Sequence, residues 1–251
     1  MSRDDPEPFL KRLHAVREPL FLVRQSKDRT IHLAVDGEVC PSKEAADFEL
    51  LGALGPQPPE SLGDPSFRED HGLRFPYVAG AMANGITSSK MVIAMAKAEM
   101  LAFFGAAGLV FDEIEKGLSE IRQGLEGLKG VTWGANLIHA PNEPKLEEAI
   151  ADLYLRTGIR RVSASSYVDP TPGLVRFALS GLSRAADGEI LRKNHVFAKI
   201  SRVEVAAKLM RPAPADVVES LLARAKITAE EARLARHVPL AEEVTVEGDS
   251  G

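Results

Sequence analysis

Cysteine is almost absent from this chain: Cys40 is the only one among 251 residues, so no disulfide can form within it. A chain without disulfides suits a reducing compartment. Cys40 lies beside Pro41 in a polar stretch that gives no indication of a nucleophile. No segment approaches the ~20 consecutive apolar residues of a membrane-spanning helix, and the first residues lack the apolar core of a signal peptide. These absences predict a cytoplasmic protein with no membrane partner.

A strong excess of either charge is lacking as well. The chain has 31 lysines and arginines against 36 aspartates and glutamates, a formal net charge of −5. Such a mildly acidic balance argues against nucleic acid as a partner. The sequence has no His, Cys, Asp and Glu spacing typical of a metal site. It also has neither a Gly-x-x-x-x-Gly-Lys loop nor a dinucleotide-binding glycine fingerprint. We therefore expect no metal and no nucleic acid.

The first sixty residues differ from the rest. Apolar runs at 19–24 and 30–35, separated by a polar turn, predict two strands. Residues 54–65 hold four prolines and two glycines, which predict a largely extended linker. We therefore expect a small β-containing N-terminal segment with its linker at 1–60, and a second domain at 61–251.

Strands and helices alternate in the second part. Apolar runs predict six strands, near 75–80, 101–104, 131–138, 161–165, 195–200 and 243–247, whose starts lie roughly 26 to 48 residues apart, the length of a βα unit. Helical patterns fill the gaps. One of them, at 143–157, carries an apolar stripe and precedes Gly158, which is suited to end a helix. No hairpin signal follows residue 74, so the pattern predicts a parallel sheet.

The stretch at 202–236 is too long for a single crossover. Pro212 and Pro214 interrupt it, and Thr228 with Glu231 forms a capping box that predicts a further short helix. We expect an inserted helical pair here. It could serve only packing, or it could form a lid or docking surface for a large substrate.

Small and polar residues follow the predicted strands. The loop at 80–83 is Gly-Ala-Met-Ala, Asn136 follows a buried run, and Lys199 needs an anionic partner because an unpaired buried lysine is costly. Glycine lets backbone N–H groups approach a flat ligand, and (β/α) barrels build their sites from such loops. The predicted fold is α/β, a TIM-type (β/α) barrel. With about six of eight strands it is incomplete, being a piece of a longer protein or an open sheet.

Several segments resemble the flavin-dependent family of nitronate monooxygenases and flavin enoyl reductases. Within it they are most similar to the PfaD branch, the trans-acting enoyl reductases of polyunsaturated fatty acid and polyketide synthases. The most specific segment is Asn-Leu-Ile-His-Ala-Pro-Asn-Glu-Pro at 136–144. The resemblance runs from about residue 62 to the end, and its other segments lie at 76–86, 103–109, 152–156, 198–201, 210–214 and 245–251.

The resemblance implies a barrel that binds FMN, takes hydride from NADPH and reduces an enoyl group on an acyl carrier protein. It places backbone N–H groups of the 80–83 loop at the flavin ring, and it places Asn136 and Lys199 at the ring's pyrimidine side. The last three residues would touch the ribityl chain and phosphate. The implied cofactor-binding residues are Gly80, Ala81, Met82, Ala83, Asn136, Lys199, Asp249, Ser250 and Gly251. From the residues alone, 80–83 could form only a tight turn. Asn136 could hydrogen-bond only to the backbone of a loop, and Lys199 could pair with a carboxylate inside the protein.

No catalytic residue is assigned within the chain. In the family the proton-handling histidine follows the Asp-Ser-Gly segment, so the resemblance places it beyond Gly251, together with the last two strands. His139 could contact substrate or assist protonation, or it could be a structural loop histidine.

Two other functions stay open. One is nitronate monooxygenase chemistry with FMN and oxygen. The other is a non-catalytic fragment that binds no flavin and contacts a carrier protein through 202–236. A homodimer is compatible with the sequence.

Overall fold

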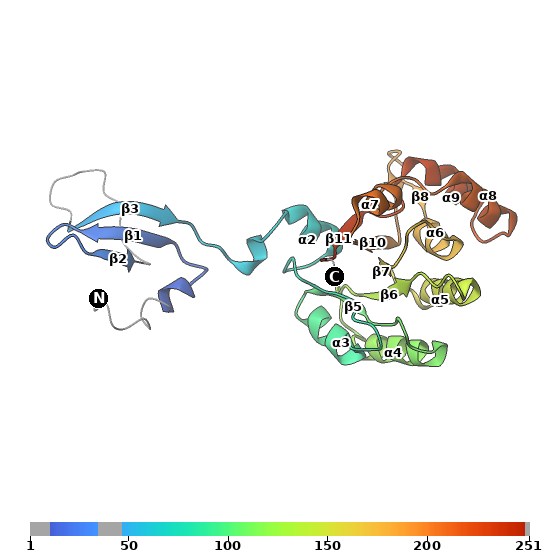
Figure 1. Cartoon of the computed structure of the whole chain (residues 1–251), viewed down its shortest axis with the longest axis horizontal. Coiled ribbons are helices and arrows are strands. Elements are labelled where there is room, and N and C mark those ends of the chain that lie inside the picture. Colours follow the sequence, from blue (N-terminus) through green and yellow to red (C-terminus); the bar gives the residue numbers. More distant parts are fainter. Residues whose placement is uncertain (1–10, 35–46, 249–251) are drawn as a thin grey trace. The chain divides into compact units, whose positions relative to one another are not determined.

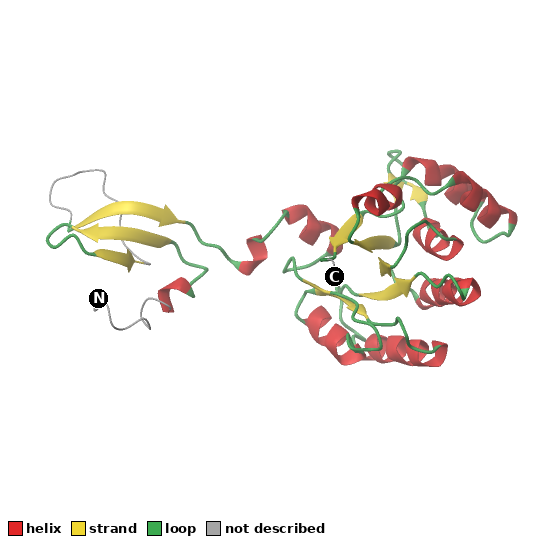
Figure 2. Cartoon of the chain, in the orientation of Figure 1, coloured by secondary structure: helices red, strands yellow, loops and turns green. Residues whose placement is uncertain are grey.

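The computed structural model describes residues 11–34 and 47–248. It divides into two compact units, Met1–Arg68 and Glu69–Gly251. Figures 1 and 2 show the elements of each unit, and each unit is treated separately below.

The N-terminal unit contains a three-stranded antiparallel sheet in the order β2-β1-β3. Its strands are β1 (Leu20–Gln25), β2 (Ile31–Ala34) and β3 (Phe48–Leu54), followed by a short 3-10 helix, η1 (Pro59–Ser61). The first two match the predicted strands. The third was not predicted, because Gly52 and a run of leucine and alanine give little strand signal. The η1 turn interrupts the predicted linker, whose flanking residues Pro58 and Leu62 are extended.

The second unit alternates strands and helices along the chain. The elements are α2 (Pro65–His71), which spans the division between the units, β4 (Val78–Ala79), α3 (Ser89–Lys97), β5 (Leu101–Phe104), α4 (Phe111–Gly124), β6 (Gly134–Ile138), α5 (Pro144–Thr157), β7 (Arg161–Ser165), α6 (Pro172–Leu179), β8 (Ser183–Arg184), β9 (Ile190–Leu191), β10 (His195–Ile200), α7 (Val203–Leu209), α8 (Ala215–Ala223), α9 (Ala229–Leu234), η2 (Ala235–His237) and β11 (Glu243–Val246).

Within the described residues, six strands form one parallel sheet in the order β11-β10-β7-β6-β5-β4. Strands that are adjacent in this sheet are also consecutive, among these six, along the chain. The helices lie on the outer side of the curved sheet (Figure 2). This arrangement is an incomplete TIM-type barrel, which confirms the predicted fold class and all six strands. The first strand is shorter than predicted, since only Val78 and Ala79 pair with β5.

One element contradicts the sequence prediction. Strands β8 and β9 form a small antiparallel hairpin between α6 and β10. The turn contains Asp187 and Gly188, and Gly188 has a φ of 93°. Since Asp-Gly is a strong hairpin signal, the signal was present in the sequence and the prediction of no hairpin was wrong.

Local sequence explains why α5 and α9 begin and end where they do. Helix α5 has Pro144 in its first turn and ends at Gly158, which adopts the left-handed conformation at φ 78°. Thr228 caps α9 by accepting a hydrogen bond from the N–H of Glu231, and the Glu231 side chain bonds back. Both predictions are confirmed.

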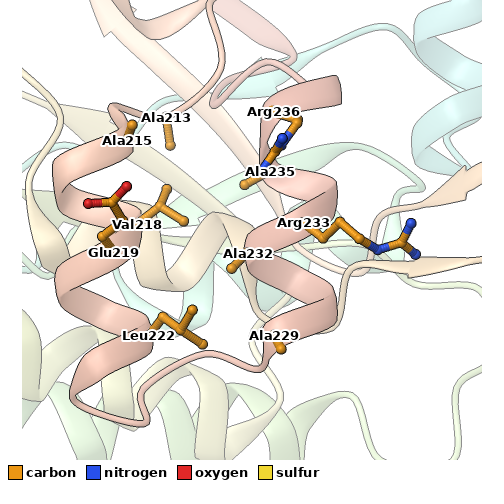
Figure 3. Close-up of a pocket in the computed structure, with 10 residues that line it drawn as sticks. All are labelled: Ala213, Ala215, Val218, Glu219, Leu222, Ala229, Ala232, Arg233, Ala235 and Arg236. Atoms are coloured by element: carbon orange, nitrogen blue, oxygen red, sulfur yellow. The ribbon is translucent and has the colours of Figure 1, made fainter.

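The stretch at 202–236 contains three helices and η2, where a pair was predicted. Helix α7 packs against β10 as an ordinary barrel helix, while α8 contacts α6 and α9. Figure 3 shows α8 and α9 on either side of a cavity of about 540 Å³, with Val218 and Leu222 facing Ala232. Glu219 and Arg233 also line it.

The core lies between the sheet and its helices. Its largest fully buried side chains include Tyr154, Phe177 and Leu137, and a Phe103–Phe197 ring pair lies with centroids 5.0 Å apart. Each such side chain contributes about 1.5–3 kcal/mol through burial. This core fixes the strand ends on which the candidate site is built.

Candidate functional site

Because the six strands are parallel, their carboxyl ends lie at one end of the sheet, where (β/α) barrels place their active sites. The loops at this end follow β4, β5, β6, β7, β10 and β11. Their side chains decide what this end can bind.

The loop after β4 is closed by Thr87. Its buried hydroxyl accepts the N–H of Met82 at 2.9 Å and donates to the carbonyl of Gly80 at 2.6 Å. The Met82 N–H, one of the predicted flavin donors, is therefore used inside the loop. By contrast, no hydrogen bond among the described residues uses the N–H of Ala81 or Ala83. Those two groups are open to a ligand.

The same loop rests on the loop after β5. The N–H of Gly105 bonds the carbonyl of Thr87 at 3.0 Å, and the N–H of Gly85 bonds the carbonyl of Gly105 at 2.9 Å. A Cβ on Gly105 would lie 2.8 Å from the carbonyl carbon of Met82 and closer still to its oxygen. The two loops can therefore pack this closely only because residue 105 is glycine.

Asn136 lies in β6 and is 3% exposed. Its side-chain NH₂ donates to the carbonyl of Ser163 at 2.9 Å and to the Ser165 hydroxyl at 2.5 Å, while its backbone carbonyl accepts the Tyr154 hydroxyl at 2.6 Å. Both amide hydrogens are thus engaged by β7. A ligand role for Asn136 would use the amide oxygen.

Lys199, in β10, pairs with Glu247 at 2.7 Å, and their side chains are 29% and 48% exposed. The pair lies on a cavity of about 270 Å³ at the carboxyl ends of β7, β10 and β11. Ser166, Tyr167 and Arg202 also line this cavity. We call it the Lys199 cavity.

His139 follows β6, and its ring stacks on that of Tyr167, with centroids 5.3 Å apart and planes at 12°. Tyr167 is 3% exposed, and burial, together with the nearby Glu147 carboxylate, raises the pKa of its phenol well above the ordinary value. Through Tyr167, His139 adjoins the Lys199 cavity.

Of the predicted site residues, Lys199 lines this cavity, whereas His139 only adjoins it. Gly80, Ala81, Met82, Ala83 and Asn136 lie at the same end of the sheet but do not line it. Asp249, Ser250 and Gly251 lie outside the described residues.

Sequence reasoning missed several residues of this end. Thr87, Tyr167 and Glu247 were not singled out. Tyr167 had a weak signal, since it follows the polar end of β7. Thr87 had no such signal, and Glu247 had only its place in the resembling segment 245–251, because each contributes by facing a group from another part of the chain.

A second polar cluster lies at the amino ends of β7, β10 and β11. Buried His71 accepts from Arg161 Nε at its Nδ1 (3.2 Å) and bonds Glu243 through Nε2 (3.2 Å), while His195 bonds Glu242 at 2.6 Å. Burial lowers the pKa of His71. Burial opposes ionisation of Glu242, but the hydrogen bond with His195 and the charge of Arg192 act together to lower its pKa. At the amino end of a barrel, such a cluster serves stability.

Comparison with known proteins adds to this geometry. No protein-family model matches the chain. A component of the polyunsaturated fatty acid synthase of Thraustochytrium sp. is 43% identical over 226 residues, 89% of this chain and 15% of the relative. Polyketide biosynthesis protein PksE of Bacillus subtilis is 42% identical over 192 residues, 76% of this chain and 25% of the relative.

A solved structure matches as well. The enoyl reductase domain of MlnA, from the macrolactin biosynthesis cluster of Bacillus amyloliquefaciens, superposes with a TM-score of 0.72 at 37% identity, covering 75% of this chain and 43% of that one. The chain belongs to the family of PfaD-type enoyl reductases. This PfaD-type chain spans less than half the length of each of these relatives. Among its described residues, no helix is both long and apolar enough to cross a membrane.

Proposed function

We propose that this PfaD-type chain is part of an FMN-dependent enoyl reductase that acts in trans in polyunsaturated fatty acid or polyketide biosynthesis. The observation that carries the proposal is the 37% identity and TM-score of 0.72 to the enoyl reductase domain of MlnA. The relatives are named as components of a fatty acid synthase and as polyketide biosynthesis proteins. We accordingly propose that the enoyl group arrives on an acyl carrier protein and that NADPH supplies the hydride.

The residues at the carboxyl end of the sheet fit a flat, anionic cofactor. Two backbone N–H groups, of Ala81 and Ala83, have no partner among the described residues. A Cβ on Gly80 would meet nothing within 4 Å, so nothing in the described protein obstructs a ligand there. Lys199 supplies a cation whose carboxylate partner is half exposed and can turn to water. These groups favour electron-rich oxygen and nitrogen atoms.

When bound, FMN would supply hydride exchange between NADPH and the enoyl group. The chain's own contribution would be to hold it: the 80–83 loop at the ring through its N–H groups, Asn136 through its amide oxygen, and Lys199 by its charge. Asp249, Ser250 and Gly251 remain predicted contacts of the ribityl chain and phosphate. His139 remains a candidate for contact with substrate.

Redox cycling under anaerobic conditions tests the proposal, on the enzyme extended past Gly251 to the predicted proton-handling histidine. Bound FMN absorbs at about 450 nm when oxidised, so NADPH should bleach the band and a crotonyl thioester of pantetheine should restore it. Restoration by the thioester, absent with the saturated butyryl thioester, is the expected result. Failure of the crotonyl thioester to restore the band would overturn the reductase proposal. Oxygen uptake with an alkyl nitronate, without NADPH, would indicate nitronate monooxygenase chemistry in its place.

A further inference from the structure

A buried carboxylate joins two loops beside the Lys199 cavity. Glu147 lies in the first turn of α5 and is 3% exposed. Its Oε2 accepts the N–H of Ala140 at 3.1 Å, and its Oε1 accepts the hydroxyl of Thr171. Ala140 belongs to the loop after β6, next to His139. Thr171 ends the loop after β7, which begins with Ser166 and Tyr167.

The surroundings compensate the burial of this side chain. A buried carboxylate is costly unless hydrogen bonds compensate it, and Glu147 receives one from each loop. Thr171 is the N-cap of α6, where the helix dipole favours negative charge. Gly173 leaves the room that the carboxylate occupies, because a Cβ there would lie 3.0 Å from Oε1. Thr171 also accepts the N–H of Leu174 at 3.4 Å, so its hydroxyl hydrogen is left to point at Glu147.

The two loops meet in the stacked rings of His139 and Tyr167, 5.3 Å apart. The Tyr167 hydroxyl is buried and makes no hydrogen bond of good geometry among the described residues, but it lies close enough to Glu147 for that carboxylate to raise the pKa of the phenol. The only polar side chain that bonds both loops is Glu147, a statement limited to the described residues. The backbone N–H of His139 also bonds the carbonyl of Ser165 at 3.0 Å, so Glu147 adds a side-chain link to this backbone contact between the two loops.

We propose that Glu147 is a positioning residue, whose buried carboxylate locks the loops after β6 and β7 together and so fixes the stack of His139 on Tyr167, a residue that lines the Lys199 cavity. The inference rests on the proposed function only in treating that cavity as part of the active site. Nothing in the locking itself requires a bound cofactor.

Proton NMR of the six histidines tests the proposal on the unliganded chain. A ring proton stacked on an aromatic ring is shifted upfield, so the His139 signals, assigned with His139→Gln, should be upfield in the wild type and move downfield in Tyr167→Leu. Glu147→Gln should reproduce the Tyr167→Leu position. The matched control is Glu148→Gln, which alters the next residue, paired with Arg224 at the surface, and should leave the shift unchanged.

A second pair of variants guards against unfolding of Glu147→Gln. Thr171→Val removes the hydroxyl that binds Glu147, and with it the cap of α6, and should also release the stack. Thr171→Ser keeps both bonds of the hydroxyl and should retain the upfield shift. An upfield shift that survives in both Glu147→Gln and Thr171→Val would overturn the positioning role. That outcome would leave the proposed function standing, because the signal is read without FMN, NADPH or substrate. Failure of the thioester assay would in turn leave the NMR result untouched.

Discussion

Replacing Gly105 with alanine should separate the two loops that carry the predicted flavin contacts. An alanine Cβ would lie 2.8 Å from the carbonyl carbon of Met82, against the roughly 3.5 Å at which carbon atoms are in favourable contact. The obstacle is backbone, which cannot rotate away as a flexible side chain can. Because the carbonyl oxygen of Met82 lies nearer still, the loop after β4 must move by more than the contact with the carbonyl carbon alone would require.

The cost follows from the contacts at stake. Overpacking of this kind costs about 1–3 kcal/mol. Movement would also strain two hydrogen bonds of Gly105, to Thr87 at 3.0 Å and from Gly85 at 2.9 Å, each contributing about 1 kcal/mol. Together these give about 3–5 kcal/mol, or a fall in melting temperature of about 6–20 °C for a unit of this size.

Thermal and urea unfolding followed by circular dichroism would measure this loss. The matched control is Gly80→Ala, in the same loop system, where a Cβ meets nothing within 4 Å; it should be neutral or gain up to about 1 kcal/mol. Equal stability of Gly105→Ala and the wild type would refute the described packing of the two loops.

Three further outcomes are expected. Tyr154→Phe leaves the buried carbonyl of Asn136 without its 2.6 Å hydrogen bond and should cost about 1–3 kcal/mol in urea unfolding; no loss would contradict that bond. Burial lowers the pKa of His71 in the folded chain, so at low pH the unfolded chain binds a proton that the folded chain does not. Stability should therefore fall as the pH drops below about 6.5. His71→Gln should flatten this dependence of stability on pH, and an unchanged dependence would show that His71 is not its source. Lys199→Met removes a partly exposed ion pair with Glu247 and should cost at most about 1 kcal/mol of stability. It should nevertheless weaken FMN binding about tenfold or more. Unaltered FMN affinity would exclude the charge of Lys199 from the site.

Much of the fold could be predicted because its signals are local. The six parallel strands follow from apolar runs spaced at βα intervals. The end of α5 follows from Gly158, and the start of α9 from the Thr228 capping box. Each of these signals lies within a few residues of the feature that it predicts.

The failures have physical causes too. Strand β3 is held by pairing with β1 and not by its own composition. In α5, the predicted apolar stripe was Leu146, Ile150, Leu153 and Tyr154. The last two are buried as predicted, but the first two are only half buried, and Glu147 and Ala151 take their place in the core. The first half of the stripe was therefore placed one residue off, and a buried acidic residue was overlooked.

In the candidate site, too, local features could be predicted from the sequence, whereas contacts between distant segments could not. The sequence predicted Lys199 and the need for an anionic partner, and the structure supplies Glu247. It did not predict that Thr87 would occupy the Met82 N–H or that Ser163 would engage the Asn136 amide. Such pairings depend on which loops meet in space, and a single sequence does not encode them in its local pattern. The flavin roles of these residues stay predictions.

The central claim is that the carboxyl ends of these strands hold FMN, and a fluorescence titration of FMN with the purified chain tests it most directly. The account predicts saturable quenching of FMN. Binding should be weaker in Gly80→Ala without any loss of stability. It should be unaltered in Gly55→Ala, a glycine of the N-terminal unit with equally open surroundings. Absence of saturable binding, or equal affinity in all three proteins, would contradict it.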